Sequence, residues 1–416
     1  MKLLIAIPAL DEEESIGPII ERCLDARSRI LRESSVTEVE ITVVSDGSTD
    51  RTVEIARRYA GDVNLIVFEH NRGYGAAISE AWLQSDADLV SFLDADGTCD
   101  PNYLIQLCNE LEEQDADVVL GCRLHGQSRM PLTRRVGNTL FAWMLSAFSL
   151  TRVRDTASGM RVVRRDSLVK LFPLPSGLHF TPAMSARAIM SRDLKITEVD
   201  MPYQERAGES KLSPIKDGLR FLGVILKTAL LYRPARPLGL IATGLLLLAI
   251  AMLAHPFFFY LKNARLEEWM IYRFLVGELF STVAVLIWCV AYLGGKAADI
   301  SLSDQPENDK YHGLLGWVFS SRWFWAAPAC CALLGGALVF DAATGFVVNG
   351  AVTEHWSRFV GMMFCLSAAA ILVVTKVVDY CLNLLADRLN FLRLMMDETT
   401  PSHKSETKLK IYRHAA

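Results

Sequence analysis

Four long apolar runs in the second half of this 416-residue chain constrain its fold more than any other feature. Each approaches the roughly 20 apolar residues that an α-helix needs to cross a bilayer. The runs follow one another with short polar links, so membrane spans explain them better than buried core helices of a large soluble domain. The sequence therefore predicts an α-helical membrane domain over 236–386. Its spans are expected at about 237–261, 274–295, 320–343 and 358–380.

Basic residues flank this domain on both sides. Lys227, Arg233 and Arg236 precede the first span, and the tail over 387–416 is rich in Lys and Arg. Such segments favour the cytoplasmic side of a membrane. The opening MKLLIAIPALDEEE is too short in its apolar part for a signal peptide. We therefore expect a multi-pass protein of the inner or plasma membrane, with its N-terminal domain and a basic, flexible tail in the cytoplasm.

The first half alternates short apolar runs with stretches of helical spacing. The runs at 2–8, 39–44, 65–68 and 89–93 predict strands, and the segments between them predict helices. This alternation is typical of an α/β domain with a mainly parallel, doubly wound sheet. Ligands of such sheets bind beyond the carboxyl ends of the strands.

Charged residues follow each of the predicted strands. Asp94 and Asp96 stand one residue apart, so they are expected to leave the end of their strand on the same side. Carboxylate oxygens suit Mg²⁺ or Mn²⁺ completed by substrate phosphates, although a lone pair of this kind also occurs in acidic surface turns. Because Glu12, Asp46 and Arg72 converge on the same edge, the sequence predicts a cleft for a nucleotide diphosphate.

Ordered motifs in this half resemble those of family-2 glycosyltransferases with the GT-A (Rossmann-like) fold. The motifs are Pro8-Ala9-Leu10-Asp11-Glu12, Ser45-Asp46-Gly47-Ser48-Thr49-Asp50, Asn71-Arg72-Gly73 and Asp94-Ala95-Asp96. Later motifs are similar to those of the dolichol-phosphate mannosyltransferase group, which uses polyprenyl-phosphate acceptors. They are Gly121-Cys122-Arg123, Arg134-Arg135 with Asn138, Asp155-Thr156-Ala157-Ser158-Gly159-Met160-Arg161, and Arg206-Ala207-Gly208-Glu209-Ser210-Lys211. The resemblance extends from Met1 to about Arg236.

The resemblance implies an inverting transferase that moves a sugar from a nucleotide-diphosphate sugar to a polyprenyl phosphate, undecaprenyl or dolichyl. The implied donor-binding residues are Pro8, Ala9, Glu12, Asp46, Arg72, Asp94, Ala95, Asp96, Arg206 and Lys211. Asp94 and Asp96 would bind the divalent cation, and Arg123, Arg134 and Asn138 the acceptor phosphate. The implied catalytic residues are Asp96, Asp155, Arg206 and Lys211, with Asp155 orienting groups or acting as a weak base. The family's usual Gln near the metal is replaced by Thr98.

Two amphipathic segments are candidates for helices at the membrane surface. The stretch from Thr139 to Leu150 is apolar and aromatic, and from spacing alone it fits a core helix equally well. The segment 213–235 mixes apolar residues with Lys216, Arg220 and Lys227, a composition typical of a helix on anionic headgroups. The predicted order is thus a GT-A domain over 1–212, this interfacial segment, the spans and the tail.

Three other functions are compatible with parts of this sequence. A processive polysaccharide synthase shares the fold and the spans, but the chain has no Gln-x-x-Arg-Trp segment. A channel or transporter is disfavoured because charges such as Lys376 and Asp379 lie near span ends, where snorkelling explains them. A catalytically inactive nucleotide-binding membrane module stays open. The formal net charge of -4 indicates no particular partner, no nucleic-acid partner is expected, and a homo-oligomer is left open.

Overall fold

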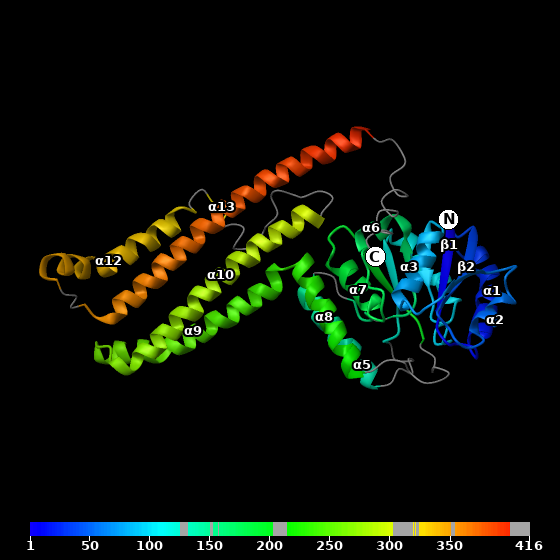
Figure 1. Cartoon of the computed structure of the whole chain (residues 1–416), viewed down its shortest axis with the longest axis horizontal. Coiled ribbons are helices and arrows are strands. Elements are labelled where there is room, and N and C mark those ends of the chain that lie inside the picture. Colours follow the sequence, from blue (N-terminus) through cyan, green and yellow to red (C-terminus); the bar gives the residue numbers. More distant parts are fainter. Residues whose placement is uncertain are drawn as a thin grey trace. The chain divides into compact units, whose positions relative to one another are not determined.

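The computed structural model describes residues 1–124, 132–149, 153–156, 158–202, 214–302, 319, 321, 324–350 and 354–399. For 132–134, 214–217, 349 and 393–399 it describes the backbone only. The described chain divides into two compact units, Met1–Ala229 and Leu230–Thr399. Figure 1 shows that the first contains the strands and the second is helical. The predicted limits at residues 212 and 236 lie on either side of this division.

Within the described residues, seven strands form one sheet in the order β3-β2-β1-β4-β6-β5-β7. Their bounds are β1 (Lys2–Ala9), β2 (Glu38–Asp46), β3 (Asn64–Phe68), β4 (Leu89–Phe92), β5 (Val118–Cys122), β6 (Arg161–Arg164) and β7 (Ile196–Asp200). The parallel pairs are β1 with β2 and β4, β2 with β3, and β5 with β7. Strand β6 runs antiparallel between β4 and β5. The mainly parallel sheet predicted from the sequence is confirmed, and β5, β6 and β7 are additions to the four predicted strands.

Helices cover both faces of the sheet. On one face α1 (Ile16–Glu33) and α4 (Tyr103–Glu113) pack on Leu3, Ile5 and Ile7 of β1, which are fully buried. On the other face, α3 (Tyr74–Gln84) and α7 (Phe180–Met190) enclose aromatic rings that include Phe92 and Phe180. Burial on both faces explains why β1 is an uninterrupted apolar run. The remaining elements of this unit are α2 (Thr52–Arg57), η1 (Arg165–Ser167), α6 (Leu168–Leu171), α5 (Leu132–Phe148) and α8 (Pro214–Tyr232).

Helices α5 and α8 are the two segments that the sequence marks as interfacial. Helix α8 has nearly the predicted bounds, whereas α5 begins seven residues earlier than predicted, at Leu132. Phe141 of α5 and Phe221 of α8 pack edge to face, with their ring centroids 6.0 Å apart. Both helices carry large exposed apolar side chains, including Val136, Trp143 and Leu219. These faces lack a partner large enough to bury them among the described residues, as expected of helices that lie on a membrane.

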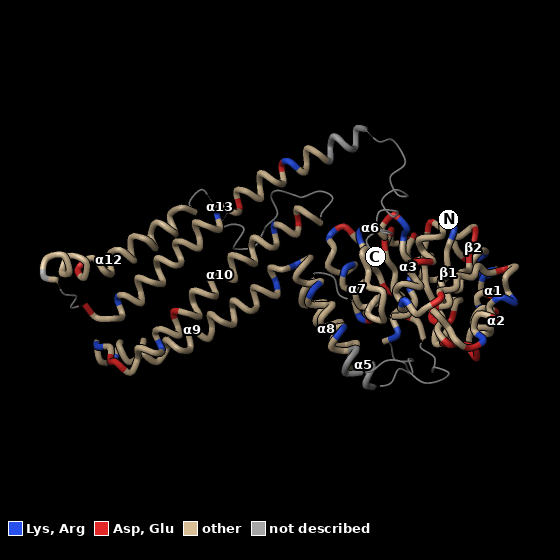
Figure 2. Tube along the Cα trace, in the orientation of Figure 1, with Lys and Arg blue, Asp and Glu red and all other residues tan. Residues whose placement is uncertain are grey.

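Among the described residues, the second unit contains four helices that are long and apolar enough to cross a membrane, which agrees with the predicted number of spans. They are α9 (Ala235–Asn263), α10 (Ile271–Leu302, preceded by η2, Glu268–Met270), α12 (Ala326–Asn349) and α13 (Trp356–Thr399). Figure 2 shows charged residues spread over the first unit, while the middle of α9 carries none. Most side chains of the four spans are exposed to their surroundings, as lipid-facing helices require.

Two predictions about this unit are wrong. The tail was predicted to be flexible from residue 387, but α13 continues to Thr399 because this stretch consists largely of strong helix formers. The second concerns Asp379, whose predicted snorkelling does not occur. Its carboxylate is 3% exposed and accepts from Tyr292 Oη at 2.9 Å and Lys376 Nζ at 3.1 Å. Lys296 of α10 also pairs with it, so the charges meet between two helices, a pairing that spacing along one helix does not reveal.

Candidate functional site

Asp94 and Asp96 lie just beyond the carboxyl end of β4, where the sequence placed them. Asp94 Oδ1 accepts a hydrogen bond from Tyr74 Oη at 2.5 Å. Asp96 Oδ1 accepts from both the backbone N and the Oγ1 of Thr98, at 3.1 and 2.7 Å. Burial and the adjacent Asp94 carboxylate raise the pKa of Tyr74, so its hydroxyl stays protonated and donates. Both carboxylates therefore have one oxygen held in place by the protein.

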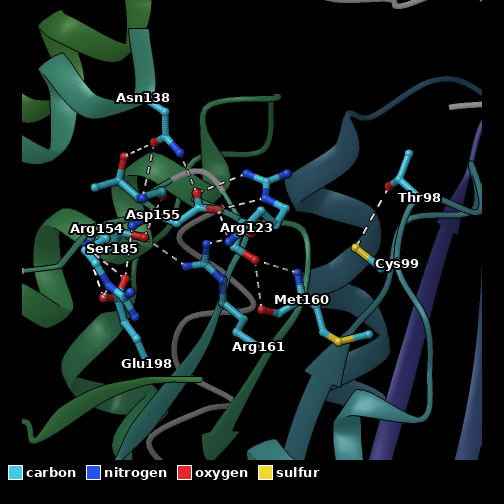
Figure 3. Close-up of polar contacts among 12 residues, drawn as sticks. Thr98, Cys99, Arg123, Asn138, Arg154, Asp155, Met160, Arg161, Ser185 and Glu198 are labelled. Carbon is cyan, nitrogen blue, oxygen red and sulfur yellow. Dashed lines mark hydrogen bonds and ion pairs between the residues drawn. The ribbon is translucent and has the colours of Figure 1, made fainter. Parts of the chain in front are cut away.

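Thr98 stands where the resembling family places a glutamine near the metal. Its hydroxyl donates to Asp96, and its side chain is 3% exposed. Figure 3 shows Thr98 beside Cys99, whose sulfur lies 3.9 Å from the hydroxyl oxygen. Thr98 thus supports Asp96 and does not extend toward the cleft. In the described part of the chain, no group of three His, Cys, Asp or Glu side chains is arranged to hold a metal ion.

Asp46 closes β2 and holds the loop that follows β3. Its carboxylate accepts from the backbone N of Arg72 at 2.7 Å and of Gly73 at 2.9 Å. Burial raises the pKa of Asp46, and the two backbone donors oppose that rise. The Arg72 side chain is largely exposed, with its guanidinium 4.4 Å from the centre of the Phe68 ring. The structure therefore brings Asp46 and Arg72 together at the edge that the sequence predicted.

The segment after β1 is fastened to the segment after β2. Pro8 and Ala9 are the last residues of β1 and pair with Val44 and Ser45. Asp11, with a φ of 49°, accepts from Thr49 N at 2.7 Å. The backbone N of Glu12 donates to Thr52 Oγ1 at 2.8 Å, and its carboxylate accepts from Ser15 Oγ at 2.9 Å. Glu12 thus lies at the start of α1 on the same edge of the sheet as Asp46.

Arg123 and Asp155 form a buried ion pair near Asp94. Arg123 Nε and Nη2 donate to the two oxygens of Asp155 at 2.8 and 3.0 Å (Figure 3). Its backbone N donates to the same carboxylate at 3.0 Å, and Asn138 Nδ2 donates at 2.6 Å. The side chain of Asp155 is 0% exposed and that of Arg123 is 12% exposed. Two residues predicted to bind the acceptor phosphate, Arg123 and Asn138, thus lie in one cluster with the predicted catalytic residue Asp155.

The electrostatics of this cluster fix its charge state. Burial alone would raise the pKa of Asp155, but the Arg123 guanidinium and the hydrogen bonds hold it below the ordinary value. For Arg123, burial acts to lower the pKa, but Asp155 outweighs that effect and raises it. Both groups are therefore ionised near neutral pH. A carboxylate with a lowered pKa and four donors is a poor proton acceptor, which favours orientation over base catalysis for Asp155.

Sequence reasoning missed two residues behind the cleft, Tyr74 and Arg161. Arg161 is fully buried and donates to Ser158 O at 2.8 Å and Ser185 Oγ at 3.1 Å (Figure 3). Its guanidinium lies 5.5 Å from the centre of the Phe92 ring. Burial lowers the pKa of Arg161 to about 10, so it still carries a positive charge at neutral pH. The sequence signal that could have identified Arg161 is its position as the last residue of the motif that begins at Asp155.

A groove of about 690 Å³ opens along α5, next to the Arg123 cluster. Apolar side chains line most of it, among them Leu124, Trp143 and Val153. Arg135 and Arg154 are the cations in its wall, and Arg154 is also paired with Glu198 and Asp200. The groove thus combines an apolar channel with cations, the surface that an amphiphilic anion requires.

Several predicted site residues lie outside the described part of the chain. Arg206 and Lys211 belong to 203–213, and only the backbone of Arg134 is described, in the first turn of α5. Of the other predicted residues, Ala95 is buried beside the carboxylate pair, 4% exposed. The described donor residues therefore gather at one edge of the sheet, and Arg123, Asn138 and Asp155 gather beside it.

Comparison with known proteins agrees with this arrangement. Residues 4–172 match the model of glycosyl transferase family 2. The chain is 34% identical to dolichyl-phosphate hexose transferase of Haloferax volcanii, over 55% of this chain and 94% of that protein. The chain is also 34% identical to low-salt glycan biosynthesis hexosyltransferase Agl6 of the same organism, over 60% of this chain. The match spans only 59% of the length of that protein. Dodecaprenyl-phosphate galacturonate synthase of Rhizobium johnstonii is 26% identical to the chain, over 61% of this chain and 75% of that protein.

These relatives and the sheet confirm the family and the fold that the motifs predicted. The relatives are enzymes whose names specify sugar transfer, and one of them is matched over nearly its whole length. The chain belongs to glycosyltransferase family 2.

Proposed function

We propose that this glycosyltransferase moves a sugar from a nucleotide-diphosphate sugar to a polyprenyl phosphate in the membrane. The observation that carries the proposal is the adjacency of two sites in one unit. A carboxylate-lined edge follows β1, β2 and β4, and the Arg123 cluster beside it borders an apolar groove. The names of relatives that act on dolichyl or dodecaprenyl phosphate support the same acceptor class.

The carboxylate pair fits a divalent cation, Mg²⁺ or Mn²⁺. Tyr74 and Thr98 orient the two carboxylates, and carboxylate oxygens are ligands that both cations prefer. Gly159 lies so close to Asp94 that an added Cβ would stand 2.1 Å from Oδ2, so the chain leaves room for the carboxylate there. Mg²⁺ and Mn²⁺ accept a ligand set that consists of two protein carboxylates and the oxygens of a substrate diphosphate. A cation bound there would neutralise charge on the departing nucleoside diphosphate.

On the acceptor side, we propose that Asp155 and Asn138 orient Arg123, which aligns the attacking phosphate. The acceptor phosphate is already an anion at neutral pH, so its oxygen needs no strong base to attack the anomeric carbon. One bond then forms between phosphate oxygen and anomeric carbon as the bond to the nucleoside diphosphate breaks, which inverts the configuration. Positioning and charge stabilisation are expected to provide most of the rate. Arg134, Arg206 and Lys211 keep their predicted roles as further cations for the phosphates.

We also propose that the cleft works at the cytoplasmic face of the membrane. The exposed apolar faces of α5 and α8 would rest on the bilayer surface, where a lipid phosphate lies. Four spans and an inside N-terminus return the chain after Thr399 to the cytoplasm.

Incubation of the purified full-length protein with polyprenyl phosphate and a panel of nucleotide sugars tests this proposal. We expect one donor to release its nucleoside diphosphate only when the lipid is present, and the lipid to gain one sugar by mass spectrometry. A reaction without lipid and a reaction with Asp96→Ala are the controls. Growth of a long glycan chain instead would favour a processive synthase, and donor binding without turnover would favour an inactive module.

A further inference from the structure

The short stretch Arg72-Gly73-Tyr74 touches both carboxylate sites of the donor cleft. The backbone N–H groups of Arg72 and Gly73 donate to Asp46. The next residue, Tyr74, turns its hydroxyl to Asp94 Oδ1, 2.5 Å away. Three consecutive residues thus join the ends of β2 and β4, which are separated in the sheet by β1.

Tyr74 is held firmly at the first position of α3. Its ring packs edge to face against Phe92 and Phe180, with centroids 6.2 and 6.5 Å away. Behind it, the backbone N of Gly75 donates to Ser176 O at 2.6 Å. An added Cβ on Gly75 would come within 2.2 Å of Pro175 O, so this approach of α3 to the loop before α7 requires glycine. The phenol therefore has little freedom to leave Asp94.

Gly159 confines the same carboxylate from another direction. A Cβ at position 159 would lie 2.1 Å from Asp94 Oδ2 and 2.8 Å from Cγ. Asp94 is thus held between a hydroxyl that fixes Oδ1 and a backbone that packs against Oδ2. A carboxylate confined in this way keeps one orientation before any ligand arrives, the condition that supporting residues create in metal sites.

We propose that Tyr74 is a positioning residue for the cation site, because its hydroxyl sets the orientation in which Asp94 meets the cation. This inference rests on the proposed function, which assigns Asp94 and Asp96 to a divalent cation. Loss of a group that orients a metal ligand typically lowers metal affinity by roughly 10- to 100-fold. Tyr74→Phe removes the hydroxyl and keeps the ring that packs on Phe92 and Phe180, so it isolates this effect.

The test is Mn²⁺ binding to the full-length protein, measured by electron paramagnetic resonance of the free ion. Four proteins are compared: the unaltered chain, Tyr74→Phe, Tyr59→Phe and Asp96→Ala. Tyr59 is the matched control, because its hydroxyl also donates to a carboxylate, Glu21 Oε1 at 2.8 Å, but on the protein surface. Thermal unfolding of each variant shows whether the fold is retained.

We expect Tyr74→Phe to weaken Mn²⁺ binding by roughly 10- to 100-fold, with Mn²⁺ binding by Tyr59→Phe unchanged and both variants keeping one cooperative unfolding transition. If Asp96→Ala loses Mn²⁺ but Tyr74→Phe binds it as tightly as the unaltered chain, the positioning role is wrong and the cation site stands. If Asp96→Ala binds Mn²⁺ normally, both the cation site and the inference drawn from it fail.

Discussion

Replacement of Asp155 by asparagine should strongly destabilise the first unit, because it leaves Arg123 buried without its counter-charge. The carboxylate is 0% exposed and receives two guanidinium donors, one backbone donor and Asn138. An asparagine amide keeps one oxygen acceptor, and its NH₂ group would face donors. Removing one partner of a buried ion pair typically costs about 3–5 kcal/mol.

Calorimetry of the full-length protein in detergent measures the size of this effect as a shift in the midpoint temperature of unfolding. A change of 1 kcal/mol shifts the midpoint of a domain of this size by about 2–4 °C, so Asp155→Asn should lower it by roughly 6–20 °C. The matched control is Asp200→Asn, which breaks the Arg154–Asp200 pair, whose two side chains are each 53% exposed. An exposed pair contributes less than about 1 kcal/mol, so this control should shift the midpoint little.

The dependence on pH gives an independent check. The pKa of Asp155 in the folded protein lies below its ordinary value of 3.8, which it regains on unfolding. Its ionised form therefore stabilises the fold fully above pH 3.8, and this contribution is lost as the pH falls through the lower folded pKa. The gap between the unaltered chain and Asp155→Asn should thus be constant from about pH 5 to 8 and shrink in stronger acid.

A double variant separates the pair from its surroundings. Arg123→Met with Asp155→Leu removes both charges, and apolar replacements of a buried pair are often near neutral in stability. The double variant should therefore be more stable than Asp155→Asn, although inactive if Arg123 aligns the acceptor. The reasoning is refuted if Asp155→Asn is no less stable than Asp200→Asn, or if the double variant is the least stable of all.

Three further predictions follow from the site and the spans. Asp96→Ala should abolish sugar transfer while leaving the unfolding midpoint within about 2 °C, since Asp96 lies outside the core; near-normal activity would remove it from the site. Asp379→Asn should destabilise the helical unit by about 3–5 kcal/mol, because Lys296 and Lys376 lose the carboxylate that they share. Asp341→Asn, at an exposed ion pair, should not destabilise it, and equal calorimetric unfolding midpoints for the two variants would contradict this prediction. A cysteine introduced within 345–354 should react with an impermeant reagent in intact cells and one within 401–410 should not; a labelled tail would mean that the orientation is wrong.

The sequence predicted the half of the fold in which the signal is local. Strands β1 to β4 are rich in apolar residues, and polar residues follow each of them, so both this part of the sheet and its polar edge could be predicted. Strand β6 could not, because Arg161–Arg164 is only four residues long and has an arginine at each end. Its place in the sheet depends on pairing with strands far away in the sequence, which periodicity does not report.

The same distinction applies to the site. The functional role of Arg123 stays a prediction, and its pairing with Asp155 could not be predicted, because Asp155 comes 32 residues later and meets Arg123 only in the folded chain. Tyr74 was overlooked because it stands between two glycines, which indicate a turn and draw attention to the backbone. Its contact with Asp94 exists because α3 begins at that tyrosine, a boundary that sequence patterns locate poorly.

The insertion of β6 between β4 and β5 also affects how the chain is made. Phe92 of β4 pairs with Arg161 of β6, which is synthesised roughly 70 residues later. At a synthesis rate of about 5–20 residues per second, one edge of β4 therefore stays unpaired for several seconds. During that interval the nascent chain presents an apolar strand whose ladder groups lack a partner on that side, a template for association with other chains. The exposed strand is the one that leads into Asp94. A fragment that ends before β6 would keep this edge open permanently, so the pairing of β6 with β4 also protects the chain from aggregation.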